Sequence, residues 1–303
     1  MRIMFMGTPD IAVPCLEALI DKYDVVCVVT QPDKPKNRGH KMSMSPVKEL
    51  ALTHSIDVLQ PITFKDSAFM PELEKYNPDV IVVIAYGRIL PKYVLDYPKY
   101  KCINVHASLL PKYRGAAPIQ WCIVNGEKIT GITTMLMDAG LDTGDMLLKR
   151  EIEITDTMTG GELHDKMALL CPDVLIETLE NIDTIKPEKQ DDSKSCYASM
   201  IDKKMTVIDW DKTPIEIVNL VRGMNPFPCA RTMLDGRLLK IYTAEVCDMK
   251  GKNGMILSLD NGIVVGCGGG SVRLTEVQPE GKRRMSASDF ILGNKTNVGA
   301  VLG

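Results

Sequence analysis

Continuous apolar runs alternate with amphipathic segments along the first third of the chain. The runs cover residues 2–6, 25–30, 80–85 and 102–106, which are lengths typical of buried strands. The segments between them place apolar residues at helical spacing, and this part of the sequence carries no hairpin signals. Strands that alternate with helices favour an α/β fold with a mostly parallel, Rossmann-like sheet.

Further elements follow from the same patterns. Residues 65–76 are predicted to form one helix, because Phe69, Leu73 and Tyr76 share a face. Alternating runs at 129–137 and 146–154 predict two strands that pair through the loop between them.

The pattern changes near residue 186. Residues 186–199 are polar and have no apolar period, which indicates a linker. A capped helix at 213–222 follows, and then five short strands separated by Gly and Asp turns, which suggest a small β-barrel. We therefore expect three parts, which are a catalytic domain at 1–185, a linker at 186–204 and a barrel domain at 205–303.

Composition favours a cytoplasmic, two-domain protein. A chain of 303 residues is long enough for two cores, and its longest aliphatic run is far below the ~20 residues of a membrane span. The start, Met1-Arg2-Ile3, enters a strand pattern and does not look like a secretory signal. The nine cysteines include no Cys-x-x-Cys pair, so we expect reduced thiols and no metal site.

Charge is divided unevenly along the chain. The net charge is −3, but residues 1–200 carry 22 basic against 28 acidic side chains, and residues 201–303 carry 14 against 11. The two parts therefore have net charges of −6 and +3. This balance permits an electrostatic contact between the C-terminal part and a nucleic acid.

Two polar side chains mark the end of the predicted strand at 102–106. Asn104 and His106 are two residues apart, so they lie on one face of that strand. Ligands of parallel sheets bind beyond the carboxyl ends of the strands, where Gly7, Gln31 and Tyr86 are also expected. The alternative is that His106 is a hydrogen-bonded interior histidine. A turn at 108–111 follows at once and favours a site.

These residues resemble the signature of the 10-formyltetrahydrofolate-dependent formyltransferases, and the resemblance covers nearly the whole chain. Three positions differ from residues common in the family, which are Ala107, Tyr113 and Phe227, and none of them removes a reacting group. The resemblance is carried in order by Met6-Gly7-Thr8-Pro9, Gln31-Pro32-Asp33 with Arg38-Gly39, Ala85-Tyr86-Gly87, Cys102 to Gln120, Leu141-Asp142-Thr143-Gly144-Asp145 and Asn225-Pro226-Phe227-Pro228.

The resemblance implies a reaction and a set of residues. A formyl group would pass from 10-formyltetrahydrofolate to the α-amino group of methionyl initiator tRNA, a step of translation initiation. Asn104 would hold the oxyanion of a tetrahedral intermediate, and His106, supported by Asp142, would stabilise that oxyanion or relay protons. The sequence leaves these two roles of His106 open. The folate would be held by Ser108, Leu109, Leu110, Pro111, Tyr86 and Gly87.

The same resemblance implies two groups of tRNA contacts and a barrel of OB-like type. The segment 32–46 is rich in Lys and Gly, and by itself it indicates a solvated loop. In the family a basic loop at this place reaches the acceptor stem, and the arginine matching Arg38 works near the active site. The predicted phosphate contacts are Lys34, Lys36, Arg38 and Lys41 in this loop, and Lys282, Arg283 and Arg284 in the barrel domain.

Other functions remain as alternatives. A formyltransferase that acts on a small amine, of the glycinamide ribonucleotide type, would share Asn104, His106 and Asp142, but it would not explain the appended barrel or the basic loop. A non-catalytic tRNA-binding protein would not need these three residues. A nicotinamide dehydrogenase would need glycines that the Gly7 turn lacks. We expect a monomer.

Overall fold

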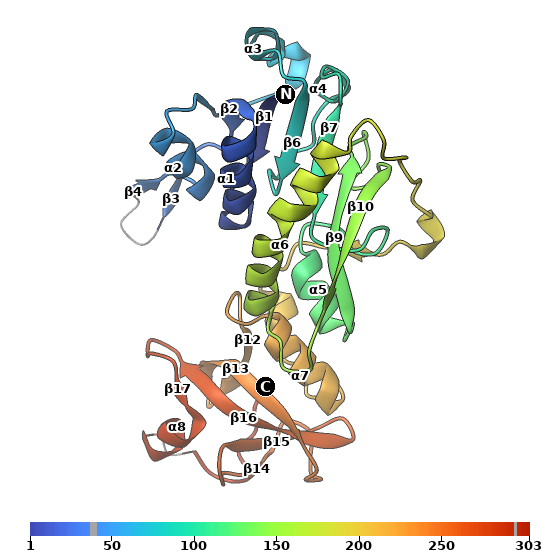
Figure 1. Cartoon of the computed structure of the whole chain (residues 1–303). Coiled ribbons are helices and arrows are strands. Elements are labelled where there is room, and N and C mark those ends of the chain that lie inside the picture. The colour runs from blue at the N-terminus through green and yellow to red at the C-terminus, as the bar shows by residue number, and fades with distance from the viewer. Residues whose placement is uncertain (37–40, 294–295) are drawn as a thin grey trace. The chain divides into compact units, whose positions relative to one another are not determined.

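The chain begins with alternating strands and helices, as its apolar runs predict. The computed structural model describes residues 1–36, 41–293 and 296–303 (Figure 1). Up to residue 213 the elements are β1 (Arg2–Gly7), η1 (Asp10–Ala12), α1 (Val13–Lys22), β2 (Asp24–Val29), β3 (Lys34–Lys36), β4 (Lys41–Ser43), α2 (Pro46–Thr53), β5 (Val58–Leu59), η2 (Lys65–Ser67), α3 (Met70–Tyr76), β6 (Val80–Ile84), α4 (Lys92–Leu95), β7 (Cys102–His106), β8 (Arg114–Gly115), α5 (Pro118–Val124), β9 (Ile129–Leu136), β10 (Met146–Glu153), α6 (Gly160–Glu180), η3 (Asp192–Lys194), β11 (Tyr197–Ala198) and η4 (Lys204–Thr206), where η marks a 3-10 helix.

Seven of these strands form one sheet in the order β10-β9-β7-β6-β1-β2-β5. The pairs from β7 through β6, β1 and β2 to β5 are parallel, and β9 joins β7 in the antiparallel direction. All residues of β6 and β7 are buried, which fits central strands covered on both faces. Figure 1 shows α1 and α6 over the same face of this sheet. The expected α/β fold with a mostly parallel sheet is confirmed.

The prediction of a single helix at 65–76 is wrong. The chain forms η2, breaks, and resumes as α3 at Met70. Asp66 and Ser67 have φ angles of 52° and 58°, which lie in the left-handed region and cannot continue a right-handed helix. The apolar spacing of Phe69, Leu73 and Tyr76 holds, but the polar residues before it take a turn.

The segment 32–46, expected to be a loop, contains two short paired strands. The backbone of β3 pairs with that of β4 in the antiparallel direction. The helix α2 then begins as predicted, because the Ser45 side chain accepts a hydrogen bond from the Lys48 N–H and Pro46 occupies the first helical turn.

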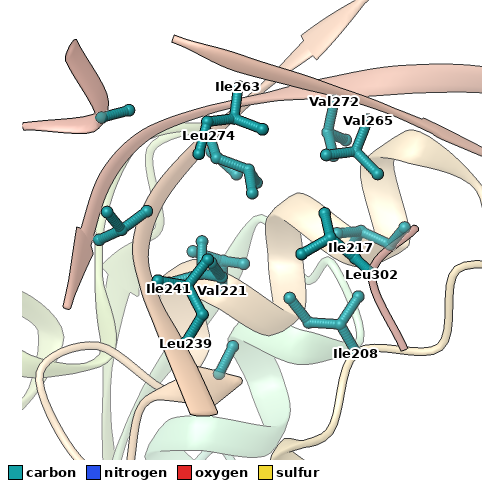
Figure 2. Packing of buried hydrophobic residues seen from close by; sticks show 14 of the residues in the cluster. Ile208, Ile217, Val221, Leu239, Ile241, Ile263, Val265, Val272, Leu274 and Leu302 are labelled. Carbon is teal, nitrogen blue, oxygen red and sulfur yellow. The ribbon is translucent and has the colours of Figure 1, made fainter. Parts of the chain in front are cut away.

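The C-terminal part is a helix packed on an antiparallel sheet of order β12-β13-β16-β15-β14, with β17 paired to β16. Thr213 and Glu216 form a capping box at the start of the helix. Figure 2 shows Ile217 and Val221 of this helix among buried side chains of the sheet, such as Ile241, Val265 and Leu274. The elements are α7 (Pro214–Gly223), β12 (Ala230–Leu234), β13 (Arg237–Cys247), β14 (Ile256–Ser258), β15 (Ile263–Cys267), β16 (Gly270–Pro279), β17 (Met285–Ser286) and α8 (Ala287–Gly293).

The chain forms two compact units, and each unit is built from segments that are not continuous in the sequence. In the second unit, the buried Arg222 donates hydrogen bonds to the carbonyls of Thr155 and Met158, which ties a segment from the middle of the chain to α7. The first unit comprises Met1–Pro118, Thr130–Glu153 and His164–Ala198, and the second comprises Ile119–Ile129, Ile154–Leu163 and Ser199–Gly303.

Candidate active site

The side chains of Asn104 and His106 lie at the carboxyl end of β7. Both are buried, with 8% and 6% of their surface exposed. They are opposite Met135 and Thr133 of β9, so the antiparallel neighbour fixes the register of the strand that carries them. Two buried hydrogen-bonding side chains are thus placed at the edge where the parallel strands end.

Asp142 reaches these two side chains from the loop between β9 and β10. Its Oδ1 accepts a hydrogen bond of 3.4 Å from Asn104 Nδ2, and its Oδ2 is 3.7 Å from His106 Nδ1. Oδ2 also accepts a hydrogen bond of 2.9 Å from the Gly115 N–H. Asp142 has a φ angle of 54°, a left-handed conformation that aspartate tolerates better than most residues. The structure therefore brings together an amide, an imidazole and a carboxylate from separate segments.

The imidazole of His106 has a different partner at each ring nitrogen. Nε2 is 2.9 Å from the carbonyl oxygen of Tyr113, which can only accept, so Nε2 carries the hydrogen. In the neutral ring the lone pair is then on Nδ1, which faces Asp142 at 3.7 Å. That distance is too long for a direct hydrogen bond and leaves Nδ1 available to a further atom.

The turn after β7 is held by Thr133 of β9. The hydroxyl of Thr133 donates 2.7 Å to the carbonyl of Ser108 and accepts 3.1 Å from the N–H of Leu110. The Ser108 hydroxyl donates to the carbonyl of Lys112. Ser108 and Leu110 are buried, and Leu109 and Pro111 are half-buried. Three hydrogen bonds therefore hold the backbone of this turn, which adjoins His106.

Tyr86 and Gly87 lie at the end of β6, the strand next to β7. The ring of Tyr86 is buried and meets Phe64 edge to face, and burial raises the pKa of its hydroxyl to about 12. The carbonyl of Tyr86 accepts a hydrogen bond from Gln31 Nε2 at the end of β2. Gly87 is exposed and has a φ angle of 79°. The Tyr86 side chain thus belongs to the core, whereas the backbone at Gly87 is open to solvent.

The predicted tRNA contacts fall on both described and undescribed parts. Arg38 and the side chains of Lys34, Lys36 and Lys41 lie outside the described residues. Lys282 and Arg283 are exposed. Arg284 pairs with Glu276 and lies over the ring of Tyr242 at 4.2 Å from its centroid, so its cation is already engaged.

Three groups at this site were missed by reasoning from the sequence. The Tyr113 carbonyl and the Gly115 N–H are backbone atoms, which no side-chain pattern reports. Of these positions only Gly115 leaves a trace in the sequence, namely the glycine itself. The structure explains this glycine, because a Cβ there would lie 2.6 Å from the Ala198 carbonyl. Gln190, whose side chain bonds the loop of Asp142, lies in a polar stretch without any pattern.

Metal ligands and membrane spans are a separate question. Among residues 1–36, 41–293 and 296–303, no three His, Cys, Asp or Glu side chains are grouped as metal ligands would be. In the same part of the chain, every helix is too short or too polar to cross a bilayer.

Comparison with protein families identifies the class. The family described as formyl transferase matches residues 1–179, and the family described as formyl transferase, C-terminal domain, matches residues 200–295. The fold is similar to that of an N-formyltransferase from Helicobacter canadensis solved with folinic acid and dTDP-3-aminofucose, with a TM-score of 0.68, 21% identity, and coverage of 91% of this chain and 98% of that one. At this identity the likeness concerns the fold alone.

Full-length relatives narrow the class further. The chain is 52% identical over 308 residues to the methionyl-tRNA formyltransferase of Clostridium novyi, and 52% identical over 310 residues to that of Acetivibrio thermocellus. Each alignment covers 100% of both proteins. The chain belongs to the formyl transferase family, and within it to the methionyl-tRNA formyltransferases.

Proposed function

We propose that the chain transfers the formyl group of 10-formyltetrahydrofolate to the α-amino group of methionyl initiator tRNA, as a step of translation initiation. The observation that carries this proposal is the meeting of Asn104, His106 and Asp142 at one sheet edge, in a chain 52% identical over its whole length to relatives named for that reaction.

The reaction sets two tasks for the protein. The amine nitrogen forms a bond to the formyl carbon, the bond from that carbon to N10 of the folate breaks, and one proton moves from the amine to N10. The intermediate is tetrahedral and carries negative charge on oxygen. The Asn104 amide is our candidate donor to that oxygen, and a donor of this kind contributes about 3–4 kcal/mol to lowering a barrier.

The geometry of His106 supports the proton-relay role among its two candidate roles. Because Nε2 donates to the Tyr113 carbonyl, the basic nitrogen of the neutral ring is Nδ1. A proton taken from the amine at Nδ1 would create a cation beside the Asp142 carboxylate, which is 3.7 Å away and stabilises it. The same proton can then pass to N10. No covalent intermediate is needed, so Ser108 is assigned to the folate-holding turn and not to nucleophilic attack.

We place the folate against the turn 108–111 and the exposed backbone at Gly87. In support of this, the turn is fixed by Thr133, so Leu109 and Pro111 would form a rigid apolar wall. Burial of the Tyr86 ring limits Tyr86 to a backbone contact.

Incubation with radiolabelled 10-formyltetrahydrofolate and charged initiator tRNA tests the activity directly. We expect label on the methionyl amine of initiator tRNA, much less on a charged elongator tRNA and none on uncharged tRNA. Label transferred equally to free methionine or to a small amine such as glycinamide ribonucleotide would point to the small-amine type of enzyme instead.

The finer assignments follow the same proposal. We propose that residues 1–185 are the catalytic domain, 186–204 connect it to the rest, and 205–303 are an OB-like, tRNA-contacting domain. We further propose a cytoplasmic monomer, with Arg38, Lys34, Lys36 and Lys41 contacting tRNA phosphates. In the C-terminal part we propose Lys282, Arg283 and Arg284 as phosphate contacts. Lys282 and Arg283 are the best supported, because both are exposed, whereas the Arg284 cation already pairs with Glu276.

The double variant Lys282→Ala/Arg283→Ala is expected to raise the KM for charged tRNA by about tenfold at low salt, and to reduce its salt slope by about one unit per removed charge. The KM for the folate and kcat should be unchanged, because neither side chain belongs to the catalytic group. Lys250→Ala, an exposed lysine of the same unit, is the matched control. An unaltered salt slope in the double variant would remove these two residues from the interface.

A further inference from the structure

The segment 186–198 begins with a solvated stretch, 186–194, in which one residue does not face solvent as its neighbours do. Residues 186–189 and 191–194 are exposed, whereas Gln190 between them is half-buried. Figure 1 shows this segment, in yellow, leaving α6 and passing β10. A glutamine turned inward within a solvated stretch indicates that its amide has specific partners.

Those partners are the backbone of the loop that carries Asp142. Gln190 Nε2 donates hydrogen bonds of 2.8 Å to the carbonyls of Asp142 and Gly144. Its Oε1 accepts a hydrogen bond of 2.9 Å from Arg114 Nε. Both N–H groups and the oxygen of the amide therefore form hydrogen bonds, and the two carbonyls that accept from it lie on either side of Thr143.

The loop has a conformation that needs such support. Asp142 adopts a φ angle of 54°, which is unfavourable for a residue with a side chain. Gly144 is packed so tightly that a Cβ would lie 1.7 Å from the Leu136 carbonyl. The position of the Asp142 carboxylate thus depends on a strained turn, and Gln190 bonds the carbonyls of Asp142 and Gly144 within it.

The same segment also contacts Tyr113, whose carbonyl is the partner of His106 Nε2. The Sγ of Cys196 accepts a hydrogen bond of 3.2 Å from the Tyr113 N–H, and β11 pairs with β8 immediately after Tyr113. The Tyr113 carbonyl is the acceptor for His106 Nε2. One stretch of chain therefore contacts the groups that flank the imidazole on both sides.

We propose that Gln190 is a positioning residue for formyl transfer, which sets the distance between the Asp142 carboxylate and the His106 ring by bonding the Asp142 and Gly144 carbonyls. This inference rests on the proposed function for its kinetic consequence, but the geometric relation stands by itself. Its proposed action runs through the loop and involves no contact with either substrate.

Gln190→Glu is the sharpest test, because a glutamate keeps an acceptor for Arg114 but has no donor for the two carbonyls. We expect kcat to fall by about 10- to 100-fold, since small misplacements of a catalytic group have effects of this size. The KM values for folate and charged tRNA should stay within about twofold, because no binding group is altered. Gln190→Met, which introduces no charge, should show the same division between kcat and KM.

Asp192→Ala is the matched control. Asp192 is on the same segment and pairs with Arg114 at 2.7 Å, and its side chain is 83% exposed. Its removal should leave kcat near the wild-type value. An equal loss of kcat in Asp192→Ala and Gln190→Glu would overturn the proposal, because the segment would then act only as a general anchor. Wild-type kcat in Gln190→Glu would overturn it as well.

A second measurement does not depend on activity. The chain has four histidines, so the ring signals of His106 can be assigned in an NMR spectrum by comparison with His106→Asn. We expect these signals to change in Gln190→Met and to remain in place in Asp192→Ala. Unchanged signals in Gln190→Met would refute the positioning role. If the wild type failed to formylate tRNA, the proposed function would fail while this comparison would still decide the role of Gln190.

Discussion

Replacement of His106 by alanine is expected to lower kcat by about 1,000-fold, within the range found when a group that transfers protons is removed. The reason is that Nδ1 is the basic nitrogen of the neutral ring and faces the Asp142 carboxylate at the carboxyl end of β7. KM values should change little, because the ring is buried and offers only one nitrogen to the substrates.

Single-turnover formylation of charged initiator tRNA gives this rate without interference from product release. The variant also leaves the Tyr113 carbonyl without this donor, which costs about 1–3 kcal/mol of stability, so thermal unfolding must be recorded beside the kinetics. His164→Ala is the control, because His164 lies on α6 at the surface beside Asp10 and Asp165. A His106→Ala enzyme within tenfold of the wild type would exclude His106 as the proton relay.

Asp142→Asn is expected to have the second-largest effect, a loss of about 100-fold in kcat. Asparagine keeps the size of the side chain and an oxygen for the Gly115 N–H, but it removes the negative charge that stabilises a protonated His106 ring. The loss should appear mainly in kcat. Thermal stability should fall slightly as well, because the NH2 of asparagine cannot accept the hydrogen bond that Asn104 Nδ2 donates to Asp142 Oδ1.

The control for Asp142→Asn is Asp138→Asn in the same loop. Asp138 Oδ1 accepts hydrogen bonds from Gly140 N and Thr143 Oγ1, and the oxygen of asparagine can accept both. We expect wild-type rates from this variant. A full rate in Asp142→Asn would show that the charge of Asp142 is not required.

Much of the fold followed from periodicity because burial itself produces the pattern. The strands β6 and β7 are buried on both faces, and a strand in that environment needs apolar residues at nearly every position, which appears in the sequence as a continuous apolar run. The break at Asp66 and Ser67 was not predictable in this way, since left-handed turns of polar residues depend on local hydrogen bonds and not on apolar spacing. The helix α8 was likewise missed, although Ser286 and Asp289 form a cap at its start.

The candidate site was predictable only in part for a related reason. Asn104 and His106 share a strand, so their spacing by two places them together without further information. Asp142 comes from a loop, and its place beside them was expected only through the family resemblance. The Tyr113 carbonyl and Gln190 contribute through contacts between segments that are distant in the sequence. Such contacts produce no periodic pattern in a single sequence, so they could not be predicted from it.

The discontinuous make-up of the second unit has a practical consequence for protein expression. Residues 119–129 and 154–163 belong to that unit, and Ile119, Cys122 and Ile123 are buried. A truncated protein that ends at residue 185 would contain these segments but would lack the rest of the unit to which they belong. Apolar surface would then be open to water, so such a truncated product should aggregate in the absence of detergent. Dissection of this enzyme is better done by point substitution than by cutting the chain between its two matched family regions.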